Sequence, residues 1–293
     1  MRTWGRRLAL GLVLGLLCVL GGVAAATPMV QNRFFTTRDG VRLHYIEAGS
    51  GDKTIVFVPG WTMPAWIFDR QIAYFSEHYH VIALDPRGQG QSQVALSGYD
   101  QDRRGADVGD LIAHVDENEA GSSPLLVGWS LGVLDVLAYV HESGGGGLAG
   151  LVLIDNSVGE NPAPLPAKSR KWAPPLPWDR EMRRFVSGMF ARSPGQVYLD
   201  RLTQSALHTP EWAAKRLLAY PVPRSYWRDA LYTVPAPILY VVTPRLRGQA
   251  ASVALHPNAQ SVIFSGTGHA LFVDEADKFN ATMQAFISSK IWQ

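Results

Sequence analysis

The chain is almost free of cysteine, with one, Cys18, among 293 residues. A disulfide within the chain needs two cysteines, and Cys18 lies in a leading segment that we expect to be removed. The mature chain would then hold no thiol nucleophile. The sequence also lacks an H-E-x-x-H motif and any cluster of histidine and aspartate ligands, so it implies no metal and no organic cofactor.

Positive charge is scarce once the first residues are set aside. The full chain has a formal net charge of +2, but without residues 1–26 it has 24 basic and 25 acidic residues. No basic stripe remains, so nucleic acid is not an expected partner.

The first 26 residues have the pattern of an export signal. Arg2, Arg6 and Arg7 precede the apolar run 8–20, and small residues end at Ala26. We expect a signal peptide over residues 1–26 and a periplasmic or secreted protein. The alternative is an uncleaved membrane anchor, because the apolar segment is nearly long enough to span a bilayer.

Short apolar runs alternate with helical patterns through most of the remaining chain, which is 47% hydrophobic overall. The predicted strands are 34–38, 41–48, 54–58, 80–84, 125–127, 151–154, 238–242 and 261–264. The predicted helices among them are 67–77, 104–118, 131–141 and 276–289. This alternation predicts an α/β fold, a doubly wound, mostly parallel eight-stranded sheet. Functional sites of such sheets lie at the carboxyl ends of the strands.

A long interval separates the sixth and seventh predicted strands. It opens with prolines and then reads as four short helices, at 180–191, 195–207, 210–220 and 223–231. We expect a helical cap over residues 161–234, inserted between core segments 27–160 and 235–293. The interval is rich in aromatic residues, some of which should line an apolar pocket.

The segment Gly128-Trp129-Ser130-Leu131-Gly132 lies between the strand 125–127 and the helix 131–141. A serine at such a strand–turn–helix apex is a nucleophile elbow. The turn strains the serine backbone, and the two glycines let the strand and the helix pass close together. Ser130 is therefore the candidate nucleophile.

Three further motifs extend this pattern. Val58-Pro59-Gly60-Trp61 and the run 85–92 each follow a predicted strand, and Gly268-His269 follows the last one. With the elbow, these motifs make the chain resemble the α/β-hydrolase superfamily, in its esterase and haloperoxidase-like branch. The chain departs from the family at Pro59, where many members carry histidine.

His269 is the candidate general base. It follows a glycine-rich turn at the end of the last strand, and it comes after the nucleophile and the acid in chain order, as the resemblance implies. The other seven histidines have no comparable setting.

The acid departs from the family pattern. Relatives usually carry it just after the strand 238–242, where this chain reads Thr243-Pro244-Arg245 and has no carboxylate before Asp274. The best candidate is Asp155, one strand earlier. Alternatively, Asp155 only caps a turn. A Ser–His pair without an acid is a further possibility, with Asp274 and Glu275 as the next candidates.

The resemblance implies an oxyanion hole made by the backbone amides of Trp61 and Leu131. The predicted function is a serine hydrolase that cleaves a carboxylic ester or related acyl substrate, a small and apolar molecule, through an acyl-enzyme. Alternatives are a perhydrolase or carbon–carbon bond hydrolase on the same triad, or a non-catalytic binding relative. A dehalogenase or epoxide hydrolase is disfavoured, because those relatives need a carboxylate where this chain has Ser130.

Overall fold

The computed structural model describes Met1 and residues 30–118, 123–159, 176–219 and 221–293. All eight strands form one sheet in the order β1-β2-β4-β3-β5-β6-β7-β8. The strands are β1 (Gln31–Thr36), β2 (Arg42–Ala48), β3 (Thr54–Val58), β4 (His80–Asp85), β5 (Leu125–Trp129), β6 (Gly150–Ile154), β7 (Ile238–Val242) and β8 (Ala259–Ile263). Only β2 pairs antiparallel with its neighbours, β1 and β4. The predicted doubly wound, mostly parallel sheet is confirmed.

The central strands are buried along their whole length, as their continuous apolar sequences predict. Successive side chains of a strand face opposite sides of the sheet. In β3, Val56 and Val58 join one hydrophobic cluster and Ile55 and Phe57 the other. A sheet with two buried faces needs helices on both, which explains the alternation in the sequence.

The two edge strands differ from their predicted bounds. β1 begins three residues earlier than predicted, at Gln31, and ends at Thr36. Its first residues are polar and partly or fully exposed, and they pair with β2, where Arg33 also forms an ion pair with Glu47. A strand held by edge pairing lacks the apolar alternation by which sequence reveals it.

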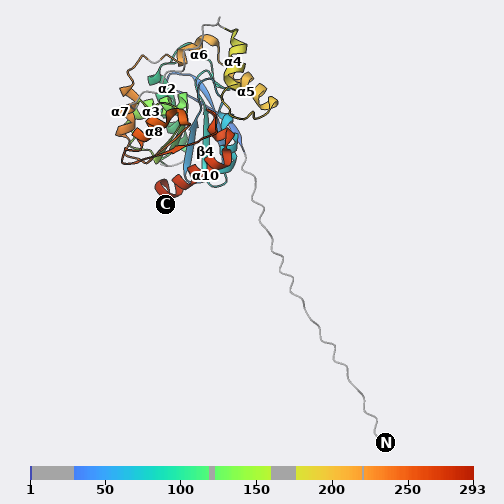
Figure 1. Cartoon of the computed structure of the whole chain (residues 1–293), viewed down its shortest axis with the longest axis vertical. Coiled ribbons are helices and arrows are strands. Elements are labelled where there is room, and N and C mark those ends of the chain that lie inside the picture. The colour runs from blue at the N-terminus through green and yellow to red at the C-terminus, as the bar shows by residue number, and fades with distance from the viewer. Residues whose placement is uncertain (2–29, 119–122, 160–175, 220) are drawn as a thin grey trace.

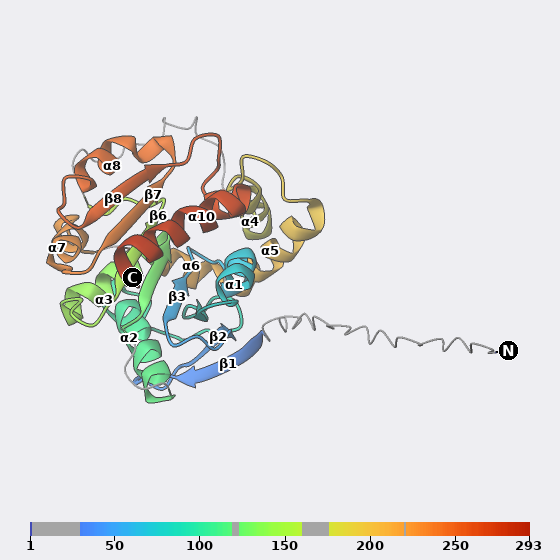
Figure 2. The same cartoon turned by 90° about the horizontal axis from the view of Figure 1, so that it is seen from below.

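The helices form two layers. They are α1 (Asp69–Phe75), α2 (Gln101–Asn118), α3 (Leu131–Ser143), α4 (Trp178–Ser187), α5 (Gln196–His208), α6 (Glu211–Leu217), α7 (Ser225–Thr233), α8 (Arg247–Val253), α9 (Leu271–Asp274) and α10 (Ala276–Phe286). Short turns of other helix types are η1 (Ala65–Phe68), η2 (Pro244–Leu246) and η3 (Ile287–Ile291). Helices α2, α3, α7 and α8 bury one face of the sheet, and η1, α1, α9 and α10 bury the other (Figure 2).

Local sequence explains how the central helix α3 is bounded. It starts directly after Ser130 and is buried along most of its length, between the sheet, α2 and α7. Gly144 follows its last residue with a left-handed φ of 73°, the usual way for a helix to end. The helix therefore projects its N-terminus from the carboxyl end of β5, in the middle of the sheet.

Four helices are seen among the described residues of the interval between β6 and β7. Helices α4, α5 and α6 lie together at one end of the sheet (Figure 1), and α4 packs on α5. Helix α7 instead packs on α3, and it buries Trp227, Ala230 and Leu231. The predicted cap begins at residue 161, and its first fifteen residues lie outside the described residues. The cap boundaries stay a prediction.

Helices α8 and η2 follow β7 and were not predicted. Pro244 and Gly248 gave this stretch the pattern of a loop. Tertiary packing overrides that local preference, because Leu246, Ala250 and Val253 are buried against the sheet.

A buried ion pair fixes the turn after β4. Arg87 is 1% exposed, and its guanidinium lies 2.7 Å from Asp107 on α2 and 2.9 Å from Asp39. The arginine holds the pKa of the Asp39 carboxyl at about 2. These contacts tie the β1–β2 hairpin to the α2 side of the sheet.

The predicted signal peptide, residues 1–26, lies outside the described residues apart from Met1. Within the described part of the chain, no helix is both long and apolar enough to cross a membrane.

Candidate active site

Ser130 has the backbone conformation of a nucleophile elbow. Its φ and ψ are 54° and −119°, and it directly precedes α3. A Cβ on Gly128 would lie 2.6 Å from the Gly132 carbonyl oxygen, and one on Gly132 would lie 2.2 Å from the Val58 carbonyl oxygen. Both glycines are therefore required for the sharp turn between β5 and α3.

Backbone strain is concentrated around this elbow. Among the described residues, the non-glycine positions with positive φ are Thr62, Ser130 and Asp155, at 59°, 54° and 46°. They follow β3, β5 and β6. Such conformations cost of order 1–3 kcal/mol each and cluster at functional sites. The left-handed conformation of Thr62 could not be predicted from the sequence, because β-branched residues rarely adopt a positive φ.

Asp155 lies at the carboxyl end of β6 and contacts His269. The Nδ1 atom of His269 lies 2.8 Å from Oδ2 of Asp155, across 114 residues of sequence. An ionised carboxylate only accepts hydrogen bonds, so the Nδ1 atom carries the proton and Nε2 is left free to accept one. The contact expected from the sequence is present.

The other oxygen of Asp155 is held by Thr243. The backbone amide and the hydroxyl of Thr243 each donate to Oδ1 over 2.8 Å. Thr243 stands just after β7, where relatives usually carry the acid. In this chain that position supplies two hydrogen-bond donors to Asp155, the candidate acid, and carries no carboxylate itself.

These contacts set the charge of Asp155. Its side chain is 2% exposed, and burial by itself raises the carboxyl pKa. The hydrogen bond and charge of His269, with the two Thr243 donors, outweigh burial and leave the pKa of Asp155 below its ordinary value. Asp155 is therefore a carboxylate at neutral pH, able to stabilise a protonated imidazole.

Trp129, the residue before the candidate nucleophile, also holds the candidate base. Its indole N–H donates to the His269 carbonyl oxygen over 2.9 Å, and the two ring centroids are 5.2 Å apart. Trp129 is 1% exposed. This contact could not be predicted from the sequence, because the second position of a G-x-S-x-G motif can hold any residue.

Asn156 fixes the elbow from the neighbouring strand. Its side-chain amide donates to the Ser130 carbonyl oxygen over 2.7 Å, while the Ser130 amide donates to Ile154 over 2.9 Å. The residue after the candidate acid therefore holds the backbone of the candidate nucleophile.

The loop after β3 lies directly against Ser130. A Cβ on Gly60 would lie 2.9 Å from the Ser130 Cβ, so only glycine permits this approach. The next residue is Trp61, a predicted oxyanion donor. The other, Leu131, is the first residue of α3, whose first backbone amides have no partner within the helix. The helix dipole favours an anion at the N-terminus of α3. The first turn contains no acidic side chain that would repel one.

The Trp61 side chain contacts helices α4 and α6. Its indole N–H donates to the Ala214 carbonyl oxygen over 2.8 Å. Its ring meets Trp178 and Phe185 edge to face, with centroids 6.0 and 4.9 Å away. The helices between β6 and β7 therefore pack directly on the candidate oxyanion loop.

The two reserve candidates for the acid bind elsewhere. Oδ2 of Asp274 accepts the backbone amides of Gly268 and Ala191, over 2.6 and 2.9 Å. Glu275 forms an ion pair with Arg192. The described residues include no group of three or more His, Cys, Asp or Glu side chains that could hold a metal ion.

Comparisons with known proteins identify the family of the chain. The model of the alpha/beta hydrolase family matches residues 55–282, so the chain belongs to the α/β-hydrolase family. It is 27% identical to a non-heme haloperoxidase of Rhodococcus erythropolis, over 87% of this chain and 99% of the relative. It is 25% identical to a bifunctional esterase/perhydrolase of Acinetobacter calcoaceticus, with the same coverage.

Solved structures share the fold. An esterase from Rhodococcus sp. ECU1013 superposes with a TM-score of 0.73 at 24% identity, over 88% of this chain and 99% of that one. Relatives over nearly the full length are hydrolases and haloperoxidases of this fold, so the chain is an enzyme of the α/β-hydrolase fold.

Proposed function

We propose that this enzyme is a serine hydrolase that cleaves a carboxylic ester or related acyl substrate. The observation that carries the proposal is the Asp155–His269 hydrogen bond at the carboxyl ends of the strands, beside a strained serine elbow. A carboxylate, an imidazole and a partly buried serine are the parts of a nucleophilic acyl transfer site.

The chemistry follows from these parts. Ser130 Oγ attacks the substrate carbonyl carbon while Nε2 of His269 takes its proton, and the carbonyl oxygen becomes an oxyanion. The backbone amides of Trp61 and Leu131 stabilise that oxyanion. The C–O bond then breaks, and His269 returns the proton to the departing alcohol. Water attacks the acyl-enzyme in the same way, which releases the acid and regenerates Ser130.

Aromatic side chains support an apolar acyl substrate. Trp61, whose backbone is the proposed oxyanion donor, contacts Trp178 and Phe185 of α4 through its side chain. An acyl group bound at the oxyanion loop would meet these rings. We therefore propose that α4, α5 and α6 form the cap over a small apolar substrate.

A fluorophosphonate probe tests the proposal. It reacts with activated serines, so it should label Ser130 in the wild type and leave Ser130→Ala unlabelled. Hydrolysis of p-nitrophenyl esters of graded chain length should be lost in the same variant. A folded wild-type protein that takes up no label would contradict the proposal and favour a non-catalytic binding relative.

A second candidate is perhydrolysis on the same triad, with hydrogen peroxide in place of water as the acceptor. The full-length similarity to a bifunctional esterase/perhydrolase and to a haloperoxidase favours it over carbon–carbon bond hydrolysis. Peracid formed from an ester and hydrogen peroxide, and absent in Ser130→Ala, would establish it.

Export stays a proposal that rests on residues 1–26 alone. Mass spectrometry of the protein from its native host should find an N-terminus at or near Thr27. A full-length chain in the membrane fraction would favour an anchor instead.

A further inference from the structure

The backbone of three consecutive residues, 268–270, is held by hydrogen bonds to other segments. The Gly268 amide donates to Oδ2 of Asp274 over 2.6 Å, and the His269 carbonyl accepts from Trp129 over 2.9 Å. The Ala270 amide donates to the Met189 carbonyl oxygen over 3.0 Å. The backbone that carries the imidazole therefore takes its position from these three partners.

The segment 188–195 between α4 and α5 makes two backbone contacts in this region. Met189 accepts from Ala270, and the Ala191 amide donates over 2.9 Å to the same Asp274 oxygen that holds Gly268. Asp274 therefore accepts one backbone amide from the loop that carries His269 and one from the segment that follows α4. One carboxylate oxygen joins them.

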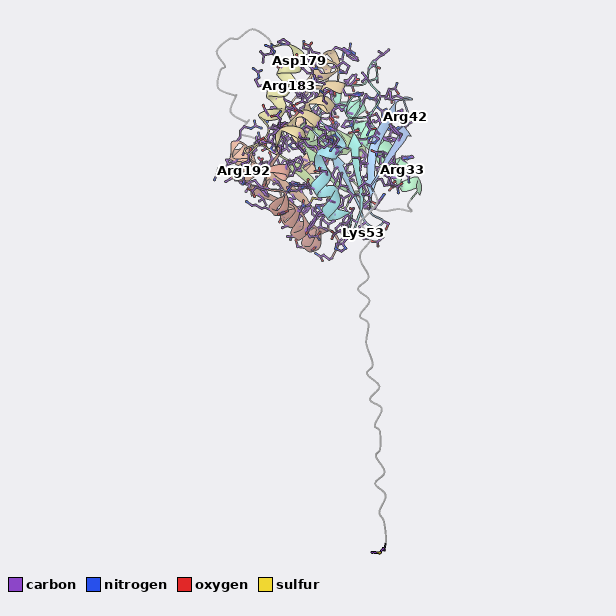
Figure 3. The ribbon with its side chains drawn as sticks, turned by 90° about the vertical axis from the view of Figure 1, so that its right-hand side faces the viewer. Arg33, Arg42, Lys53, Asp179, Arg183 and Arg192 are labelled. Carbon is purple, nitrogen blue, oxygen red and sulfur yellow. The ribbon has the colours of Figure 1, made fainter. Side chains whose placement is uncertain are left out.

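The two segments are packed without spare room. A Cβ on Gly268 would lie 2.3 Å from the Met189 carbonyl oxygen and 2.7 Å from the Ala191 nitrogen. Beyond them, Arg192 forms an ion pair with Glu275, at the surface marked in Figure 3. The contact between the segment and the loop is continuous from Met189 to Arg192.

We propose that Asp274 is a positioning residue for His269, and that it makes the placement of the base depend on the segment between α4 and α5 being docked. The proposal rests on the proposed role of His269. The imidazole reaches Asp155 only if its backbone stays in place, and the amide before it is held by Asp274. An error of about 1 Å in the position of a reacting group can reduce the rate about a hundredfold.

Steady-state kinetics on p-nitrophenyl acetate test this with the full enzyme. Asp274→Ala should lower kcat about 10- to 100-fold, the usual effect of losing a supporting contact, with KM changed less than about threefold. Asp274→Asn keeps a carbonyl oxygen that can accept a hydrogen bond, so its kcat should lie between those of the wild type and Asp274→Ala. The control is Asp277→Asn, which removes an exposed charge from the first turn of α10 and should stay within about twofold of the wild type.

Two readouts separate positioning from general destabilisation. The low-field proton resonance of the His269 Nδ1–H should shift or broaden in Asp274→Ala, and fluorophosphonate labelling of Ser130 should slow in parallel with kcat. Gly268→Ala keeps every carboxylate but forces the two segments apart, so it should give the same loss of kcat. If Asp274→Ala does not fold, the kcat of Gly268→Ala still tests whether this contact positions His269.

The outcomes are distinct from those of the proposed function. A wild type that takes no label refutes the role of Ser130 and His269 themselves. A wild type that is labelled, with Asp274→Asn and Gly268→Ala labelled as fast as Asp277→Asn, would overturn the positioning role of Asp274 alone.

Discussion

Thr243 donates both its backbone amide and its hydroxyl to a single oxygen of Asp155, each over 2.8 Å. The second oxygen of Asp155 is thereby turned to His269. The end of β7, where relatives usually carry the acid, here supports the candidate acid at the end of the neighbouring strand β6. The pairing fixes which Asp155 oxygen faces which partner, and this leads to the first prediction.

Asp155→Asn should lower kcat for ester hydrolysis by about 10⁴-fold, by analogy with the equivalent change in a serine protease. Thr243 only donates at this point, so the carbonyl oxygen of the new amide should face Thr243 and its NH₂ group should face His269. The imidazole then has its proton on Nε2, which cannot accept the serine proton. The measurement is kcat on a p-nitrophenyl ester, with melting temperature as the control for folding. A loss of less than about tenfold would mean that Asp155 only caps a turn.

Asp155 should remain ionised well into the acid range. Its pKa lies below the ordinary value of 3.8, so it stays charged as pH falls, and its contribution to stability is lost only below that value. We therefore expect the carboxyl carbon resonance of Asp155, followed by NMR, to keep the chemical shift of a carboxylate from neutral pH down to about pH 4. A titration of that resonance within this range would contradict the prediction.

Gly60→Ala should impair catalysis with little effect on folding. The added Cβ would lie 2.9 Å from the Ser130 Cβ and 3.3 Å from the Trp129 ring, so the oxyanion loop must move away from the serine. Removal of one oxyanion donor costs about 10²–10³-fold in kcat in a serine protease, and a displaced loop should cost about as much. Kinetics on the same ester measure this. Gly144→Ala is the control, because a Cβ there has nothing within 4 Å; its left-handed φ affects stability alone. Equal kcat in both variants would count against the oxyanion assignment of Trp61.

Arg87→Met should destabilise the fold by up to about 3–5 kcal/mol, because it removes the buried guanidinium that pairs with Asp107 and leaves this buried carboxylate with the more exposed Arg103 alone. At about 2–4 °C per kcal/mol, the melting temperature should fall by roughly 10 °C. The matched control is Arg183→Met (Figure 3), whose pair with Asp200 is more than half exposed on both sides and contributes at most about 1 kcal/mol. Similar melting temperatures for the two variants would show that the buried pair adds little.

Local sequence determined the fold and the elbow. Strands β3 to β7 are short apolar runs because both faces of the sheet are buried there, and β3 and β7 have the predicted bounds. Gly128 and Gly132 indicate the turn at Ser130 because a side chain at either position would collide with backbone. These features depend on neighbours within a few residues, so a sequence pattern can carry them.

Tertiary structure decided what surrounds the elbow. Thr243 and Asp155 are 88 residues apart, and Asp155 and His269 are 114 apart, so no local pattern could show that they meet. The same holds for Asp274: the sequence made it a reserve acid, but its carboxylate binds two backbone amides. The side-chain type shows which chemistry is available. Only the packing of the strand ends and of the segment after α4 determines which group each carboxylate serves.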